Sequence, residues 1–326
     1  MKWAATLLLL LPFYTLAQDI HFSDILQNKI FLDPSVTAIP ANSNTAGIIY
    51  RNQGRSITTP YKTYGLWYSS ALNPKFLRKD KMGIALAASH DGAGDGNLQQ
   101  TRINLCGSFA KSLMADRLYV SLGYGIGITN RSIDFSKLTF ASQWNGHTFD
   151  PSAPQNEPYQ NSSIFYMDMM AGISALYRIS NQISVEGGVA LDHISEPKET
   201  FYVDRNQLGR KIFTYSNMRI AMEKIVYSPG VAFISQSGNR EFLLGSDVTI
   251  LISEVYIGAG LWYRWNSDII PSMMIMMNNL ELSFSYDANV GIMHPASKYR
   301  GGMEVSLIVS MNHKKRGKYD CEEVEF

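Results

Sequence analysis

The sequence predicts an all-β protein, a single antiparallel transmembrane β-barrel of about 14 strands. Three observations lead to this prediction. Apolar and polar residues alternate over many segments, these segments are long, and the connections between them alternate between long and short. A barrel with long external loops and short periplasmic turns accounts for all three.

The composition excludes several other classes of protein. Lys and Arg total 29 against 28 Asp and Glu, a net charge of +1, so no nucleic-acid partner is expected. Charged residues make up 17% of the chain, below the roughly 25% of soluble domains. After the N-terminal region no apolar run is long enough for a membrane-spanning helix. A secreted β-protein and an outer-membrane barrel remain.

The first 17 residues have the features of a secretory signal peptide. Lys2 provides the positive n-region, and the apolar stretch 3–16 is short for a membrane span. A small-x-small site follows, so we expect cleavage after Ala17. The segment 18–45, which precedes the first predicted strand, is assigned to the periplasm.

The strand period is clearest in segment 117–129. Leu118 and Leu122 fall on one face, whereas Tyr119 and Ser121 fall on the other. The polar faces of such segments are rich in Gly and Ser, which suits a barrel interior. Their lengths suit tilted transmembrane strands of ~9–11 residues better than sandwich strands of ~5–6. The predicted strands are 46–53, 60–70, 81–90, 101–110, 117–128, 164–177, 182–192, 212–222, 226–236, 240–250, 254–265, 270–277, 279–289 and 300–311.

The long connections fall at one end of the predicted barrel. They are 91–100, 129–163, 193–211 and 291–300, and most connections at the other end are tight. Outer-membrane barrels place long loops outside the cell and short turns in the periplasm. Both termini are then expected in the periplasm.

The expected organisation is a signal peptide, a barrel domain at 18–311 and a periplasmic tail at 312–326. Two cysteines are too few for a disulfide scaffold. Cys106 lies in a predicted strand and Cys321 in the polar tail, and whether they pair is left open.

Sequence patterns typical of catalysis or metal binding are absent. No HExxH, CxxC, GxSxG or Walker motif occurs. Asp192-His193 could belong to a Ser-His-Asp set, but neighbouring strand residues point to opposite faces. The run 91–96 resembles half of a calcium loop but lacks the closing Glu of an EF-hand. No enzyme activity, cofactor or metal is predicted.

The connection 129–163 is the candidate binding surface. Loops longer than ~15 residues are usually functional or disordered. This one presents Trp144, Phe149 and Tyr159 among Pro and Asn residues, a combination that suits binding to a protein or glycan. We expect these three residues to bind a partner. The alternative is a loop folded into the barrel mouth as a plug.

Several motifs, taken in order, resemble the PorP/SprF family. QDIHFSD at 18–24 and FLDPSVTA at 31–38 resemble the opening of that family, and YRNQ follows at 50–53. The later motifs in the same order are GVALDHISEPKETF, GAGLWYR, LELSFSYD and GGMEVSL. The chain departs from the family at Asp33, where Asn is usual, and in its terminal CEEVEF, where a Cys-Pro-Arg-Phe-like end is common.

The resemblance implies an outer-membrane barrel of Bacteroidetes tied to the type IX secretion system. The implied partners are a secreted surface protein with a type IX C-terminal sorting domain, often a gliding adhesin, other components of the system, and outer-membrane lipid. A non-enzymatic barrel that helps to export or hold that surface protein is the main hypothesis. The alternative is a passive porin with a water-filled lumen. Its lining would be Glu186, Asp192, Glu254, Arg264, Glu281 and Asp287.

Overall fold

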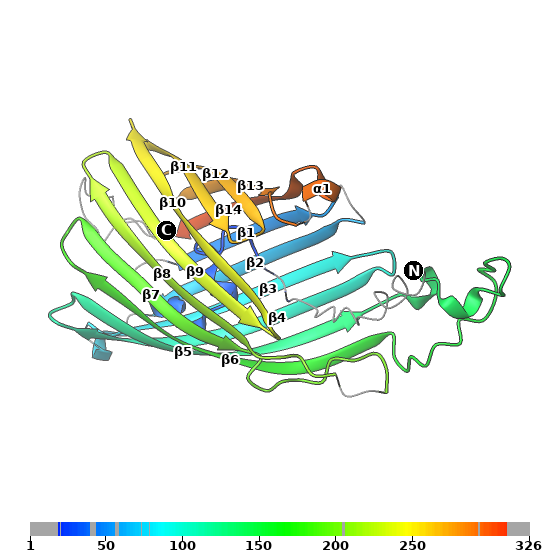
Figure 1. The fold of residues 1–326 in the computed structure, drawn as a ribbon. Coiled ribbons are helices and arrows are strands. Elements are labelled where there is room, and N and C mark those ends of the chain that lie inside the picture. Colours follow the sequence, from blue (N-terminus) through cyan, green and yellow to red (C-terminus); the bar gives the residue numbers. More distant parts are fainter. Residues whose placement is uncertain are drawn as a thin grey trace, which may run out of the picture.

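The computed structural model describes residues 19, 21–39, 44–55, 59–72, 74–77, 79–203, 206–292 and 294–311, and shows a closed barrel of 14 antiparallel strands (Figure 1). Strands adjacent in sequence are adjacent in the barrel, and the first and last strands pair to close it. The strands are β1 (Asn44–Gln53), β2 (Tyr61–Leu72), β3 (Lys81–Ala93), β4 (Leu98–Leu113), β5 (Leu118–Ser132), β6 (Ser163–Arg178), β7 (Ile183–Asp192), β8 (Lys211–Met222), β9 (Ile225–Gln236), β10 (Asn239–Ile252), β11 (Val255–Arg264), β12 (Asp268–Met277), β13 (Leu280–Asn289) and β14 (Arg300–Met311). The predicted fold and strand number are confirmed. The predicted signal peptide and tail, with Cys321, lie outside the described residues.

Alternation along the strands separates an exposed outer face rich in apolar residues from a buried inner face that mixes polar, small and apolar residues. In β13, Leu282 and Phe284 are exposed on the outside, whereas Glu281 is buried inside. Such an outer face suits contact with lipid, and a closed barrel leaves no unpaired sheet edge. Among the described residues no helix is long and apolar enough to cross a membrane.

The connections distinguish the two ends of the barrel. The long-loop end carries the β5–β6 loop (133–162), the β7–β8 loop (193–210) and the β13–β14 loop with the short helix α1 (His294–Ser297) (Figure 1). The opposite, short-turn end carries tight turns and the helical turn η4 (Lys75–Leu77). One predicted long loop is wrong, because β3 and β4 remain paired out to Ala93 and Leu98.

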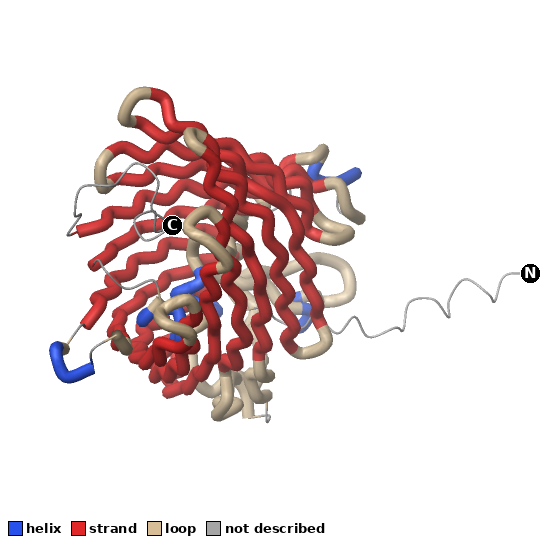
Figure 2. The backbone as a smooth tube through the Cα atoms, turned by 90° about the vertical axis from the view of Figure 1, so that its left-hand side faces the viewer, coloured by secondary structure: helices blue, strands red, loops and turns tan. Residues whose placement is uncertain are grey.

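Asp19 and residues 21–39, which precede β1, lie inside the barrel, so their assignment to the periplasm is wrong. We call Asp19 and residues 21–39 the plug. It contains the helical turns η2 (Lys29–Phe31) and η3 (Pro34–Ala38), and the strands surround it when the barrel is viewed toward the short-turn end (Figure 2). Sequence period could not reveal this placement, because the plug contains no regular strand or long helix.

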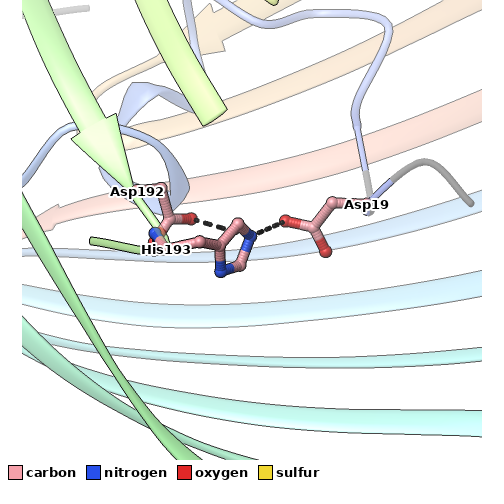
Figure 3. A group of neighbouring side chains, drawn as sticks. All are labelled: Asp19, Asp192 and His193. Atoms are coloured by element: carbon pink, nitrogen blue, oxygen red, sulfur yellow. Dashed lines mark hydrogen bonds and ion pairs between the residues drawn. The ribbon is translucent and has the colours of Figure 1, made fainter. Parts of the chain in front are cut away.

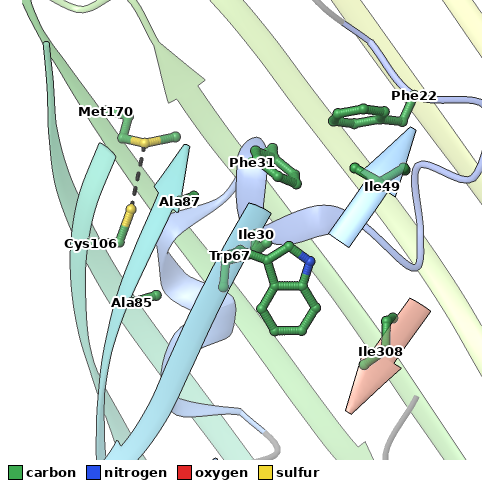
Figure 4. Close-up of a cluster of buried hydrophobic side chains, with 10 residues drawn as sticks. All are labelled: Phe22, Ile30, Phe31, Ile49, Trp67, Ala85, Ala87, Cys106, Met170 and Ile308. Atoms are coloured by element: carbon green, nitrogen blue, oxygen red, sulfur yellow. Dashed lines mark hydrogen bonds between the residues drawn. The ribbon is translucent and has the colours of Figure 1, made fainter. Parts of the chain in front are cut away.

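Apolar side chains of the plug are buried against two opposite parts of the inner barrel wall. Phe22 and Phe31 join a cluster with Ile49 and Trp67 of the first strands (Figure 4). Ile25 and Leu32 join a second cluster on strands β7 to β12, which includes Phe213 and Trp262. Burial of each such side chain is worth about 1.5–3 kcal/mol, which the periplasm would not provide. The predicted strand residue Cys106 is buried in the first cluster.

Glycines on the inner face make room for the plug. A Cβ atom at Gly83 would overlap the Thr37 backbone, and one at Gly123 would overlap the backbone at Ser35. One at Gly172 would overlap the Asp33 carboxylate. The Gly-rich inner faces that the sequence indicated therefore have a specific purpose here, since larger residues would exclude η3.

Candidate functional site

The distal part of the β5–β6 loop folds as a small hairpin, residues 140–153, which we call the tip. Gln143 is 3% exposed. Its side chain accepts a hydrogen bond from the Phe140 N–H at 2.9 Å and donates to the carbonyls of Pro151 and Ala153, both at 3.1 Å. The Asn145 carboxamide accepts from two backbone N–H groups of the turn that follows it. These local bonds give the tip a defined shape although it projects away from the barrel (Figure 1).

Two of the three predicted binding residues meet at the tip. Trp144 and Phe149 form an isolated antiparallel bridge. Their side chains remain 54% and 43% exposed. The tip thus presents two large aromatic groups to solvent on an ordered support.

Tyr159, the third predicted residue, lies in a different cluster. Its ring stacks on buried Phe135 with centroids 3.9 Å apart and planes 7° from parallel. Phe201 and Tyr202 of the β7–β8 loop contact the same Phe135 ring edge-on. Tyr159 therefore helps to fasten the two long loops together, while part of its surface stays exposed.

An ion pair extends the joint between these loops. Arg131, at the end of β5, pairs with the buried Glu199 carboxylate of the β7–β8 loop, and the Tyr166 hydroxyl donates to the same carboxylate at 3.2 Å. Sequence reasoning missed Phe135 and Glu199. Their residue types were visible in the two long loops, but nothing local indicated which of them would meet.

A buried charged cluster surrounds the start of the plug. His193 Nε2 lies 3.2 Å from Asp19 and 3.7 Å from Asp192 (Figure 3). Its Nδ1 contacts Asp168. The expectation that Asp192 and His193 point to opposite faces is wrong. β7 ends at Asp192, and His193 adopts a left-handed φ of 57°, so strand alternation no longer applies.

The same carboxylates already have cationic partners. Lys211 contacts Asp19 and lies 3.4 Å from Asp192, and Arg102 pairs with Asp192 at 2.6 Å. Although burial opposes the charged imidazole, the neighbouring carboxylates of Asp192, Asp168 and Asp19 raise the pKa of His193 to about 9.

This charge balance decides what the cluster can do chemically. Asp19, Asp192 and His193 lie close enough together to share a metal ion. The cluster, however, already contains Lys211, Arg102 and a protonated His193, so it offers little net negative charge to a divalent cation. Ser195 donates to Asp168 rather than to His193, so the described residues form no Ser-His pair here.

A second charged cluster holds the plug on the opposite wall. The Arg51 guanidinium lies 2.7 Å from Asp287 and 3.3 Å from Glu304. Ser23 of the plug donates its N–H to Glu304 at 2.7 Å and its hydroxyl to Asp287 at 2.6 Å, and it contacts Arg51. These wall charges therefore bind the plug directly.

Most residues predicted to line an open porin do line the lumen. Asp192, Arg264, Glu281 and Asp287 are buried there, and Glu186 pairs with Lys29 of the plug at 2.6 Å. Glu254 is the exception, because it lies exposed in the β10–β11 turn. The plug occupies the space that an open pore would need.

The two carboxylates of the run 91–96, which resembles half of a calcium loop, accept hydrogen bonds from threonine side chains. Asp91 belongs to β3 and accepts a hydrogen bond from Thr63 at 2.5 Å. Asp95, in the β3–β4 turn, accepts one from Thr59. Asp91 therefore lies in a strand and Asp95 in the turn that follows it, so the run 91–96 is not one continuous loop.

Comparison with known families identifies the chain. The model of the family described as "Type IX secretion system membrane protein PorP/SprF" matches residues 15–308. The chain therefore belongs to this family, and its resemblance to PorP/SprF is confirmed. No curated protein matches the chain.

Solved structures with similar folds are outer-membrane barrels. A deltaS2 mutant of the TodX monoaromatic hydrocarbon channel is 7% identical, with a TM-score of 0.54, and the match covers 86% of this chain and 93% of that one. The TodX deltaS2S3 mutant is 8% identical, with a TM-score of 0.50 and the same coverage. At such identity the likeness shows the fold alone. Fold and family together place the protein in the outer membrane, where the long-loop end is the external end.

Proposed function

We propose that this PorP/SprF-family barrel is a non-enzymatic docking component of the type IX secretion system, assisting export or surface attachment of a secreted partner. The family resemblance suggests an adhesin-like surface protein with a type IX C-terminal sorting domain. The observation that carries the proposal is the external tip, where Trp144 and Phe149 are exposed on an ordered hairpin.

The construction of the tip suits protein recognition. Interfaces draw most of their energy from a few large anchors, and aromatic residues are enriched among them. Gln143 and Asn145 already hold the hairpin in shape, so binding costs less conformational entropy than ordering a free loop would. Tyr159 contributes by joining the two external loops through Phe135.

The filled lumen argues against the passive porin. The plug contacts opposite walls through apolar clusters and through charged groups. A solute would have to cross this packed interior. We therefore expect little or no steady conductance from the purified protein in planar bilayers, and large stable channels would favour the porin.

The test removes the tip while keeping the part of the loop that packs on Phe135. Residues 141–153 are replaced by a Gly-Ser linker, which leaves Gln155 and Tyr159 in place against Phe135. A second variant carries Trp144→Ala and Phe149→Ala, and its matched control carries His147→Ala at the same tip. The surface proteome of intact cells is compared after each barrel is shown to insert normally.

We expect a large secreted protein to leave the cell surface in the first two variants but not in the control. It should appear in the medium or be degraded inside the cell. An unchanged surface proteome in both variants would show that the tip does not dock the partner. If deletion of the whole gene also changed nothing, the docking function itself would be wrong.

A further inference from the structure

The short-turn end carries three large apolar side chains that face solvent. Phe76 of η4 is 79% exposed, Met114 of the β4–β5 turn is 66% exposed and Ile179 of the β6–β7 turn is 47% exposed. We call these three residues the turn patch. They lie beyond the ends of the strands, so they do not belong to the apolar band that faces lipid. Exposed apolar side chains that gather on one surface mark a site of interaction.

Hydrogen bonds hold the three turns side by side. Asp80, which follows η4, accepts a hydrogen bond from the Ser112 N–H near the end of β4 at 3.0 Å. The Arg178 N–H, at the end of β6, donates to the Arg117 carbonyl of the β4–β5 turn at 2.7 Å. The β4–β5 turn therefore joins the other two, and the turn patch is an ordered surface.

Positive groups surround the turn patch. The Lys79 and Lys111 side chains are 67% and 58% exposed, and Arg117 is also exposed. The carboxylates that pair with the two lysines, Asp116 and Asp80, are only 27% and 15% exposed. The surface thus presents more positive than negative charge to solvent, and it suits a segment that combines acidic with apolar side chains.

The tail, residues 312–326, contains such a segment and lies outside the described residues. Its part 319–326 reads YDCEEVEF, with four acidic side chains and no basic one. Tyr319, Val324 and Phe326 supply apolar groups. The preceding part 313–318, HKKRGK, is basic, and the positive groups around the turn patch would repel it. Only residues 319–326 therefore match the surface.

The position of β14 puts this segment within reach of the turn patch. β14 ends at Met311, which pairs with Asn44 of β1 at the short-turn end. Neighbouring strands lie about 4.8 Å apart, and β4 is four strands from β14, a distance of about 19 Å along the wall. The ten residues 312–321 can span up to about 33 Å. Cys321 can therefore reach the β4–β5 turn.

We propose that residues 319–326 bind to the turn patch, with their carboxylates beside the three surrounding cations and their apolar side chains on Phe76 and Met114. The chain thus supplies its own occupant for this surface. The contact involves neither the tip nor a secreted partner, so its failure would leave the proposed function unchanged, and the reverse also holds.

The experiment measures which site the native Cys321 thiol meets. The purified full chain carries Cys106→Ala, which leaves Cys321 as its one thiol. Ala115→Cys adds a second thiol beside Met114. The matched control, Asn279→Cys, adds it in the β12–β13 turn, where the Asn279 carbonyl accepts from the Ser310 N–H at 2.8 Å. Both sites are exposed. Disulfide formation with copper–phenanthroline as the oxidant is followed on non-reducing gels.

We expect the disulfide with Ala115→Cys to form about fivefold faster than the disulfide with Asn279→Cys. A tail without a preferred site would give the opposite order, because Asn279 lies next to β14 and Ala115 lies four strands away. The triple variant Glu322→Gln, Glu323→Gln and Glu325→Gln should remove the preference for Ala115→Cys, and so should about 1 M NaCl. Phe76→Ala should weaken it.

A second measurement avoids the disulfide. In a background with Cys106→Ala and Cys321→Ser, the thiol of Ala115→Cys should react with a maleimide about fivefold more slowly in the full chain than in a variant that ends at Lys318. The thiol of Asn279→Cys should react equally in both.

Three results would overturn the proposal. The first is a faster disulfide at Asn279→Cys than at Ala115→Cys. The second is a preference for Ala115→Cys that survives both the triple Gln variant and Phe76→Ala. The third is an equal maleimide rate at Ala115→Cys with and without residues 319–326. In the last case the turn patch would be free for lipid or for another protein.

Discussion

The tip and the plug are both irregular segments, but they are held in shape in opposite ways. In the tip, Gln143 bonds to carbonyls at most 10 residues away. In the plug, Ser23 bonds to Glu304 across 281 residues, and Asp19 contacts Lys211 across 192. A segment held by its own neighbours can change without disturbing the barrel. A segment held by the barrel wall cannot change without disturbing the barrel. This difference suits the tip to binding a partner and the plug to filling the lumen.

The largest effect is expected from Arg51→Ala, which removes the cation between Asp287 and Glu304. All three side chains are at most 3% exposed. Breaking such a buried ion network by removing one partner costs about 3–5 kcal/mol. The loss of the fast-migrating folded band on heating in detergent should shift to much lower temperature. Lys79→Ala, which breaks an exposed pair with Asp116, should leave that temperature unchanged. Similar shifts in both variants would contradict a plug held by buried charge.

Raising the pH should weaken the hold of the barrel on the plug, because His193 pairs with Asp19. The pKa of His193 in the folded protein, about 9, exceeds its ordinary value of 6.5. Protonated His193 therefore stabilises the fold fully below about pH 6.5, and this contribution is lost as the pH rises through 9. The loss should amount to about 3 kcal/mol by pH 10. The carboxylates of Asp19, Asp168 and Asp192 face the imidazole. Arg102 and Lys211 pair with the same carboxylates.

Thermal unfolding measured between pH 6 and 10 tests this prediction. In the His193→Gln variant the unfolding temperature should depend less on pH over that range than in the wild-type protein. If the unfolding temperatures of the wild-type protein and the variant fall equally with pH, loss of the His193 proton does not cause the destabilisation.

A smaller loss of stability is expected from Gly123→Ala, where the barrel wall packs against η3 of the plug. The added Cβ would meet the Pro34 and Ser35 backbone, which cannot move aside as a flexible side chain would. Overpacking of this kind costs about 1–3 kcal/mol. The matched control is Gly92→Ala, where a Cβ would meet nothing within 4 Å. Equal unfolding temperatures for the two variants would show that η3 is not closely packed against the barrel wall.

The smallest global effect is expected from Gln143→Ala, at the tip. It removes three hydrogen bonds that hold the hairpin, at about 1 kcal/mol each. Because these bonds are local, the barrel should unfold at the wild-type temperature while limited proteolysis cuts the tip faster. A lower unfolding temperature would mean that the tip is coupled to the barrel and would weaken the comparison with the plug.

The sequence predicted the strands of the barrel correctly, but it did not predict that the plug lies inside the barrel. Leu122 and Ser121 were assigned to opposite faces, and the structure places them so, because alternation is a property of neighbouring residues. The plug was assigned to the periplasm, although FLDPSVTA supplied part of the resemblance to the family. Nothing local in that segment reveals that Gly83 and Gly123 leave space for it.

The candidate site shows the same division. Trp144, Phe149 and Tyr159 were recognisable as the large aromatic groups of the longest loop. Their grouping was not, since Trp144 pairs with Phe149 while Tyr159 stacks on Phe135. Their role in docking a partner remains a prediction.

The sequence by itself determined the barrel, its 14 strands, the faces of each strand and the end that carries the long loops. Each of these follows from the order and spacing of residues near one another in the chain. Only the tertiary structure decided that the lumen is filled, that Asp192 and His193 meet Asp19, and that Arg51 holds Ser23. These contacts join residues far apart in sequence, and their energy depends on burial and charge neighbours that exist only once the barrel has closed.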